Sequence, residues 1–277
     1  MKKVWLITGA SQGLGLALVK YLLAHNQQVI ATTREPLCFK AKTKLEHPNL
    51  EVIGLDLTSE ADVKHTITNI IKHYGRIDVL INNAGFGYLG AIEEATQEDI
   101  ARVFEINVHA ALRMIRLVLP GMRSARSGHI VNISSIGGLS ASAGFGIYNA
   151  TKFAVEGFSE ALAAEVKDFG IHVTIVEPGY FRTGFLDHSL VMARNDIADY
   201  RNTSGKAKLN RIVRNGKQPG NPDLAAKAIF TVASGNNPPL RLLLGEDAYE
   251  RATQKFTQTL QEFERMKPLT IATAYTD

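Results

Sequence analysis

Short apolar runs without polar alternation recur along the chain, and longer amphipathic stretches separate them. A strand of a parallel sheet is covered by helices on both faces, so it is apolar along its whole length. We therefore predict seven buried parallel strands, at Lys3–Thr8, Gln28–Thr33, Leu50–Gly54, Val79–Asn82, Gly128–Ser134, His172–Glu177 and Leu240–Leu244.

The stretches between the apolar runs have helical spacing. We predict helices at Gly13–His25, Glu60–His73, Gln97–Ser124, Tyr148–Phe169, Asp223–Ser234 and Gly245–Arg265. Strands that alternate with helices, without a Pro/Gly/Ser-rich linker between two cores, predict one doubly wound, Rossmann-like α/β domain over residues 1–277. One irregular segment, about 183–221, follows the sixth strand, and a connection of that length is usually functional. We expect a mobile substrate lid there.

Composition places the chain among ordinary globular proteins, with 45% hydrophobic and 21% charged residues. The apolar run after Lys3 is too short for a signal peptide, and no stretch approaches the roughly 18 apolar residues of a membrane span. We expect a cytoplasmic protein without membrane association. Cys38 is the only cysteine and the eight histidines are scattered, so no metal site is expected.

The net charge of +4 arises from basic and acidic residues that are interleaved along most of the chain, so nucleic-acid binding is not expected. The exception is the segment from Arg194 to Lys217, which holds seven basic and two acidic residues. Two interpretations are open: a solvated surface loop, or a segment that attracts an anionic cofactor or substrate.

A glycine-rich loop joins the first predicted strand to the first helix, with the spacing Gly-x-x-x-Gly-x-Gly. Glycine permits a sharp turn and a close approach of the backbone to a pyrophosphate, and the helix N-terminus adds N–H donors. The spacing differs from the Gly-x-Gly-x-x-Gly of most dinucleotide-binding folds. The candidate cofactor contacts here are Gly9, Ser11, Gln12, Gly13, Leu14 and Gly15.

Three residues have the chemistry for carbonyl reduction. Tyr148 and Lys152 are four residues apart and share one face of a helix, and Ser135 ends a strand at the same edge of the sheet. A tyrosine pKa is ordinarily about 10, so proton transfer near pH 7 needs a nearby cation. We predict that Tyr148 is the acid/base, that Lys152 lowers its pKa, and that one serine of the Ser134-Ser135 pair donates to the substrate oxygen.

These motifs resemble, in order, those of the short-chain dehydrogenase/reductase family. The similarity covers the loop Thr8–Gly15, Asn82-Asn83-Ala84-Gly85, Asn107, Ser135, the Tyr148/Lys152 pair, and Pro178-Gly179 with Thr183. Within the family, the runs Tyr148–Glu160 and Pro239–Gly245 are most similar to the 17-beta-hydroxysteroid dehydrogenase-like carbonyl reductases.

The resemblance implies further roles. Ser135, rather than Ser134, is the catalytic serine, which leaves Ser134 as a strand-end hydroxyl with its hydrogen bonds satisfied. Lys152 also binds the nicotinamide ribose, and Asn107 holds a water of a proton relay. The remaining cofactor contacts implied are Asp56 and Leu57 at the adenine, Asn83, Ala84 and Gly85 at the adenosine ribose, and Pro178, Gly179, Phe181 and Thr183 at the nicotinamide.

Cofactor choice is predicted from the end of the second strand. NAD-binding folds usually place a carboxylate near Thr33, but that residue is neutral and Arg34 follows it. Arg34, with Ser11 in the loop, can bind a ribose 2′-phosphate. We expect NADP(H) to be preferred, with NAD(H) possible.

The substrate is expected to be a small hydrophobic ketone, aldehyde or secondary alcohol, steroids included, because the candidate pocket residues are Phe86, Phe145, Tyr180, Phe185 and Leu186. A homodimer or homotetramer is expected through the helices around the fifth strand, with Pro268–Asp277 as a second docking segment. Two alternatives stay open: an epimerase or dehydratase that retains its cofactor, and a catalytically silent nucleotide sensor.

Overall fold

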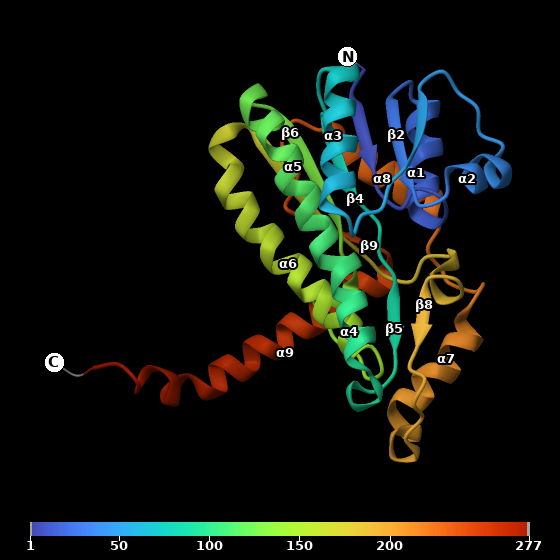
Figure 1. Cartoon of the computed structure of the whole chain (residues 1–277). Helices are drawn as coiled ribbons and strands as arrows, with labels where there is room; N and C mark the ends of the chain where they lie inside the picture. The colour runs from blue at the N-terminus through green and yellow to red at the C-terminus, as the bar shows by residue number, and fades with distance from the viewer. Residues whose placement is uncertain (1, 276–277) are drawn as a thin grey trace.

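A computed structural model describes residues 2–275. Seven strands form one parallel sheet in the order β3-β2-β1-β4-β6-β7-β9 (Figure 1). This confirms the predicted α/β fold with its seven-stranded parallel sheet. The strand bounds are β1 Val4–Ile7, β2 Gln28–Thr33, β3 Leu50–Gly54, β4 Val79–Asn82, β6 Gly128–Ile133, β7 Ile171–Pro178 and β9 Arg241–Leu244.

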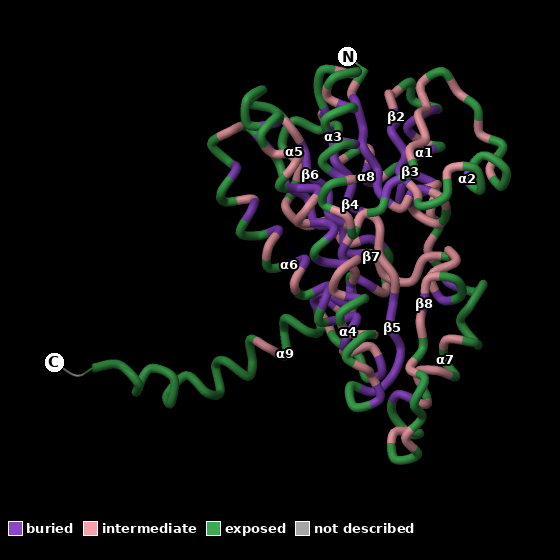
Figure 2. Tube along the Cα trace, in the orientation of Figure 1, coloured by how far each residue is buried: buried purple, intermediate pink, exposed green. Residues whose placement is uncertain are grey.

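Helices cover both faces of the sheet, which explains why its strands are apolar throughout. On β1, Trp5 and Ile7 pack in one core with α1 and α8, whereas Val4 and Leu6 pack in the other with α3, α5 and α6. Figure 2 shows the buried strands between these layers. The helix bounds are α1 Gly13–Ala24, α3 Glu60–Tyr74, α5 Ala110–Ala125, α6 Gly146–Val166 and α8 Pro222–Ser234.

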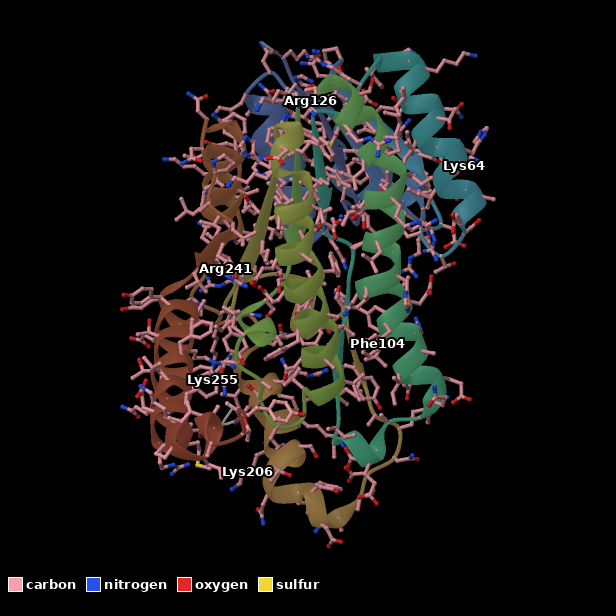
Figure 3. All side chains as sticks on the ribbon, turned by 90° about the vertical axis from the view of Figure 1, so that its left-hand side faces the viewer. Lys64, Phe104, Arg126, Lys206, Arg241 and Lys255 are labelled. Atoms are coloured by element: carbon pink, nitrogen blue, oxygen red, sulfur yellow. The ribbon has the colours of Figure 1, made fainter. Side chains whose placement is uncertain are left out.

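Two helical features differ from the sequence prediction. A short helix, α2 (Pro36–Thr43), was not predicted, because Phe39 is its only buried residue and it lacks a periodic apolar stripe. The helix predicted over Gln97–Ser124 is interrupted: α4 (Gln97–Phe104) and α5 are joined by a π-helical segment, Glu105–His109. Figure 3 labels Phe104 at this junction. An inserted π turn changes which residues face the sheet, and such turns are frequent at functional sites.

The segment 183–221 contains more regular structure than predicted. It includes β8 (Leu190–Met192), which pairs in parallel with β5 (Gly87–Leu89), and the helix α7 (Lys206–Arg214). β5, β8 and α7 lie together beyond the main sheet (Figure 1). The fully buried carboxylate of Glu94 fastens the segment to the body: it accepts from Ile197 N at 3.0 Å and pairs with Lys208 at 3.3 Å.

The last helix, α9 (Glu246–Ile271), extends beyond its predicted end and leaves the body of the molecule (Figure 1). Its first turns pack through Ala248 and Ala252 on Ile136 and Leu139. The distal part is exposed along its length (Figure 2). Of the docking segment predicted at Pro268–Asp277, the final two residues lie outside the described part of the chain.

Candidate active site

A cavity of about 630 Å³ lies where the carboxyl ends of β1, β2, β4, β6 and β7 meet. Ligands of open α/β sheets bind at this edge. Of the residues proposed from the sequence for cofactor, catalysis or substrate, all but Gly15 and Asn107 line it. Residues more than 150 positions apart are thereby brought to one site.

The glycine-rich loop turns through conformations that favour glycine. Gly9 and Gly13 have φ angles of +63° and +56°. Gly15 needs its small size for another reason: a Cβ there would lie 2.5 Å from Asn83 Nδ2 and 2.6 Å from Gly9 O. The loop therefore packs directly against the segment after β4, and the N-terminus of α1 is left facing the cavity.

Asn83 fastens this loop from the neighbouring strand. Its Nδ2 donates to the carbonyl oxygens of Thr8 at 2.9 Å and Gly9 at 3.0 Å, and the backbone N–H groups of Asn83 and Ala84 both donate to Thr8 Oγ1 at 3.0 Å. The Asn83 amide is thus occupied in holding the loop. Its side chain supports the cofactor site through the backbone, and its contribution to ribose binding stays a prediction.

Arg34 and Asp56 line the part of the cavity formed by the loops after β2 and β3, where the sequence predicts the adenosine end of a cofactor. Arg34 lines the cavity, whereas the adjacent Glu35 does not. Asp56 accepts from Thr58 N at 2.9 Å and Thr58 Oγ1 at 2.7 Å, and these hydrogen bonds lower the pKa of its carboxyl. The loop after β2 therefore places a cation at the cavity, and the loop after β3 places a carboxylate acceptor there.

Ser135, Tyr148 and Lys152 converge at the other end. A Cβ at Gly137 would lie 3.3 Å from Ser135 Oγ and 3.5 Å from Tyr148 Cε1, so both side chains face one point. The Lys152 Nζ lies 5.8 Å from the centre of the Tyr148 ring and donates to Ile133 O at 2.8 Å. The strand end of β6 and the first turns of α6 supply the three side chains together.

Burial dominates the electrostatics of the tyrosine and the lysine. It raises the pKa of Tyr148 to about 12, while the Ser135 hydroxyl acts in the opposite direction. It lowers the pKa of Lys152 to about 8, with Glu156 acting in the opposite direction. Each group is thus disfavoured in its charged form, and Lys152 does not produce the lowered Tyr148 pKa that the sequence predicted. A ligand charge or dipole would have a large effect on both groups.

Asn107 lies in the π-helical segment, and its side chain is fully engaged. Its Oδ1 accepts from Phe86 N at 3.0 Å, and its Nδ2 donates to Phe86 O at 2.9 Å and to Thr151 Oγ1 at 3.0 Å. A Cβ at Gly85 would lie 3.1 Å from Asn107 Oδ1 and 3.7 Å from Lys152 Nζ. Asn107 thus positions the backbone of Phe86 beside Lys152, and its role in a water relay stays a prediction.

Aromatic rings form the walls beside Tyr148. Its ring centre lies 5.5 Å from that of Phe185 and 6.3 Å from that of Phe145. Tyr180, Phe86 and the buried Leu186 also line the cavity. Pro178, Gly179, Phe181 and Thr183 follow β7 along the same cavity. The arrangement gives an apolar compartment with the tyrosine hydroxyl at one side.

An ionic cluster lies behind Ser135, Tyr148 and Lys152. Arg241 pairs with Glu156, Glu177 and Glu160, and burial followed by the neighbouring Glu156 raises the pKa of Glu177 to about 7. Ser134 Oγ is buried without a hydrogen-bond partner among the described residues. The prediction of a satisfied Ser134 hydroxyl is therefore wrong, and the neighbouring Glu156 Oε1 is also buried without a partner among the described residues.

Several cavity residues were missed by sequence reasoning. Arg251 comes from α9, and Gln218, His188, Ser189 and Val191 come from the segment after β7. Gln12 Nε2 donates to Ser189 Oγ at 3.0 Å, so this segment reaches the glycine-rich loop. No local motif marks these residues, since only the tertiary structure brings them to the cavity.

Comparison with known proteins identifies the family. The model of the short chain dehydrogenase family matches residues 3–191, more than half of the chain. The protein belongs to this family. Among the described residues, no helix combines the length and apolar character needed to cross a membrane.

Individual relatives agree with this assignment. A 3-ketodihydrosphingosine reductase from Bacteroides thetaiotaomicron is 40% identical over 88% of each chain. The crystal structure of a short-chain dehydrogenase from Streptomyces avermitilis has a TM-score of 0.91 and 38% identity, with 99% of this chain and 100% of that chain covered. ElxO with NADP bound has a TM-score of 0.73 and 29% identity, over 88% and 96% of the chains. This short-chain dehydrogenase is therefore an oxidoreductase whose structural neighbours include an NADP complex.

Proposed function

We propose that this protein is an NADP(H)-dependent oxidoreductase that interconverts a ketone or aldehyde with the corresponding alcohol, on a substrate with a large apolar part. The observation that carries the proposal is that Ser135, Tyr148 and Lys152 line the same cavity as the glycine-rich loop. A nicotinamide cofactor bound there supplies or accepts the hydride. The reductase among the relatives supports the proposed reaction, and the NADP complex among the structural neighbours supports the proposed cofactor.

In the reduction, the hydride joins the carbonyl carbon and Tyr148 donates its hydroxyl proton to the oxygen, which yields an alcohol and a tyrosinate. Ser135 donates a hydrogen bond to the same oxygen as negative charge develops on it. Lys152, close to the ring face, stabilises the tyrosinate with its ammonium. Solvent then returns the proton to Tyr148.

Cofactor preference and the substrate lid belong to the same proposal. Arg34 is available to a ribose 2′-phosphate at the adenosine end, so NADP(H) is the preferred cofactor. Residues 183–221 act as a lid, supported by the position of Thr183, Phe185 and Ser189 along the cavity. A cytoplasmic location and a single functional domain over residues 1–277 stay predictions from the sequence.

The direct test is oxidation of NADPH, and of NADH, with a panel of hydrophobic ketones and aldehydes. Turnover of at least one carbonyl compound with NADPH is the expected result. Cofactor binding without turnover of any compound would instead support the nucleotide-sensor alternative. Release of an isomerised or dehydrated sugar nucleotide without net cofactor consumption would support the epimerase alternative.

A further inference from the structure

An arginine at the substrate end of the cavity lacks an acidic partner. Arg251, on α9, is half-buried and lines the cavity. Its Nη2 donates to Ser140 O at 2.9 Å and to Ser142 Oγ at 3.0 Å. Within the described residues no carboxylate oxygen lies within 4.0 Å of its guanidinium. A partly desolvated cation without a counter-ion is unfavourable unless a ligand supplies one.

The acceptors of Arg251 belong to the loop that connects the catalytic residues. This loop runs from Ser135 to Tyr148, and Ser142 N donates to Asn149 Oδ1 at 3.0 Å. The nearest acidic residue on the same face of α9, Asp247, is directed elsewhere, since its Oδ2 accepts from Tyr180 N at 2.8 Å. The guanidinium is thus held at the catalytic end of the cavity, away from Arg34 at the adenosine end.

We propose that the physiological substrate is an amphipathic carbonyl compound or alcohol with a carboxylate or phosphate group, and that Arg251 binds this anion. The inference rests on the proposed function. The apolar part of the substrate packs on Phe145, Tyr180 and Phe185, and the anion forms a charge-assisted pair with the guanidinium. Among the described residues only Nη2 of Arg251 forms hydrogen bonds, so its Nε and Nη1 suit an acceptor with two oxygens.

The test pairs each anionic substrate with its neutral ester. The probes are 4-benzoylbutyric acid with its methyl ester, and the corresponding phosphonic acid with its dimethyl ester. In the unaltered protein we expect the acid of at least one pair to have a higher kcat/KM than its ester. Arg251→Gln retains an amide that can donate to Ser140 O but removes the charge, so it should lower kcat/KM for the acid by about 10- to 100-fold. The ester should change by less than about 3-fold.

Comparison of the two acids distinguishes a carboxylate site from a phosphate site. The acid whose kcat/KM falls more in Arg251→Gln carries the preferred anion. Arg265→Gln is the control, because it removes one exposed positive charge of α9 far along the helix from the cavity. An equal loss for acid and ester in Arg251→Gln would overturn the proposal and assign Arg251 to loop positioning. A KM for NADPH that rises with the loss would assign it to the cofactor.

A binding measurement separates this inference from the proposed function. The acid is titrated by calorimetry into the NADP⁺-loaded protein and into Arg251→Gln. Arg251-dependent binding of the acid without turnover would retain the anion site while removing the oxidoreductase proposal. Turnover of the esters with no preference for the acids in the unaltered protein would retain the function and overturn the anion site.

A second, independent observation concerns the distal part of α9. Beyond Ala252 this helix leaves the body, and Phe256, Leu260 and Phe263 are 54%, 60% and 66% exposed. Figure 1 shows the projecting helix, and Figure 3 labels Lys255 on it. At about 100° per residue the three apolar side chains lie within an arc of about 60°. Such a stripe on a projecting helix is typical of an interface.

Charges beside the stripe indicate which partner fits. Lys255 and Glu262 are two turns apart on the same flank of the stripe, and neither has an ion-pair partner among the described residues. A two-fold axis perpendicular to the helices places the same flank of two antiparallel copies side by side. With the axis between residues 258 and 259, Lys255 faces Glu262 of the second copy, and Phe256 lies between Leu260 and Phe263 of that copy.

We infer that α9 pairs in antiparallel fashion with α9 of a second copy of this chain. A helix pair of this length buries on the order of 1,000 Å², near the lower limit for a specific interface. The dimer is therefore concentration-dependent. The self-complementary charges favour a second copy over a strongly acidic or basic partner.

Sedimentation equilibrium of the whole protein tests the pairing. Lys255→Glu and Glu262→Lys should each raise the dimer dissociation constant by about tenfold or more, and the double variant should restore it, because the pair is then inverted at both ends. Leu260→Glu should abolish association through α9 and leave only the assembly expected through the helices around β6. A protein that is monomeric at about 100 μM, an association state that Leu260→Glu leaves unchanged, or single reversals without effect would overturn the inference.

Discussion

At the scale of single residues, Tyr148 carries the proposed chemistry, because its hydroxyl is the acid at the apolar end of the cavity. Tyr148→Phe removes the proton donor and leaves the glycine-rich loop intact. We expect the dissociation constant for NADPH to stay within about 3-fold and kcat to fall by at least about 100-fold. Fluorescence titration and steady-state kinetics measure the two quantities. Substantial turnover in the phenylalanine variant would contradict the assignment.

The pH dependence of reduction should report Lys152. Reduction requires a protonated Tyr148 and a charged Lys152. The pKa of Tyr148 is about 12, so the tyrosine stays protonated below that pH. The pKa of Lys152 is about 8, so the lysine loses its charge as pH rises through that value. We therefore expect kcat/KM for ketone reduction to fall above about pH 8. In Lys152→Ala the activity should be lower throughout and this descending limb should be absent. The same limb in the alanine variant would assign it to another group.

We expect single residues to decide cofactor choice as well. A charge-assisted contact between Arg34 and the 2′-phosphate is worth roughly 1.5–3 kcal/mol, or about a 10- to 150-fold preference for NADPH in kcat/KM. Thr33→Asp with Arg34→Ala should reverse the preference without abolishing hydride transfer, because a carboxylate repels the phosphate. Glu35→Gln is the matched control, since Glu35 does not line the cavity. An unaltered protein that uses NADH equally well would contradict this assignment.

At the scale of elements, the local pattern of the sequence was sufficient for the parallel sheet and for the loop after β1. It was insufficient where partners are distant. The three-residue strands β5 and β8 pair only with each other, across about 100 positions of sequence. Arg251 reaches Ser142 from 109 positions away. The π segment that carries Asn107 has a helical sequence, and only its packing shows the inserted turn.

The proposed lid, residues 183–221, should exchange amide hydrogens in two distinct parts. α7 has no buried residue, so without ligands its amides should exchange rapidly, and bound NADPH with substrate should slow them. The stretch around Ile197 is held by the buried Glu94 and should be protected even without ligands. Glu94→Gln, which loses the ion pair with Lys208, should remove that protection. Strong protection of α7 in the ligand-free protein would contradict the lid.

At the scale of the whole molecule, the two cores lie on opposite faces of the central strands, and the candidate catalytic residues lie where those strands end. The candidate active site, the proposed lid and the start of α9 are therefore attached to one sheet. We expect them to unfold together with that sheet in one cooperative transition. The amino ends of these strands lie away from the candidate site, so a substitution there can change stability without changing the site. There, His129 on β6 is buried and its Nε2 lies 3.0 Å from Thr174 Oγ1 of β7.

Burial, together with the nearby His172, lowers the pKa of His129 to about 4. In the unfolded chain the histidine pKa is about 6.5, so between that pH and about 4 the unfolded state binds a proton that the folded state does not bind. Stability should therefore decrease by roughly 3 kcal/mol as pH falls from about 6.5 to about 4. In His129→Gln this part of the decrease should vanish, whereas in His65→Gln, an exposed control on α3, it should remain. Urea unfolding at a series of pH values measures it, and equal acid lability of His129→Gln and the unaltered protein would show that another group is responsible.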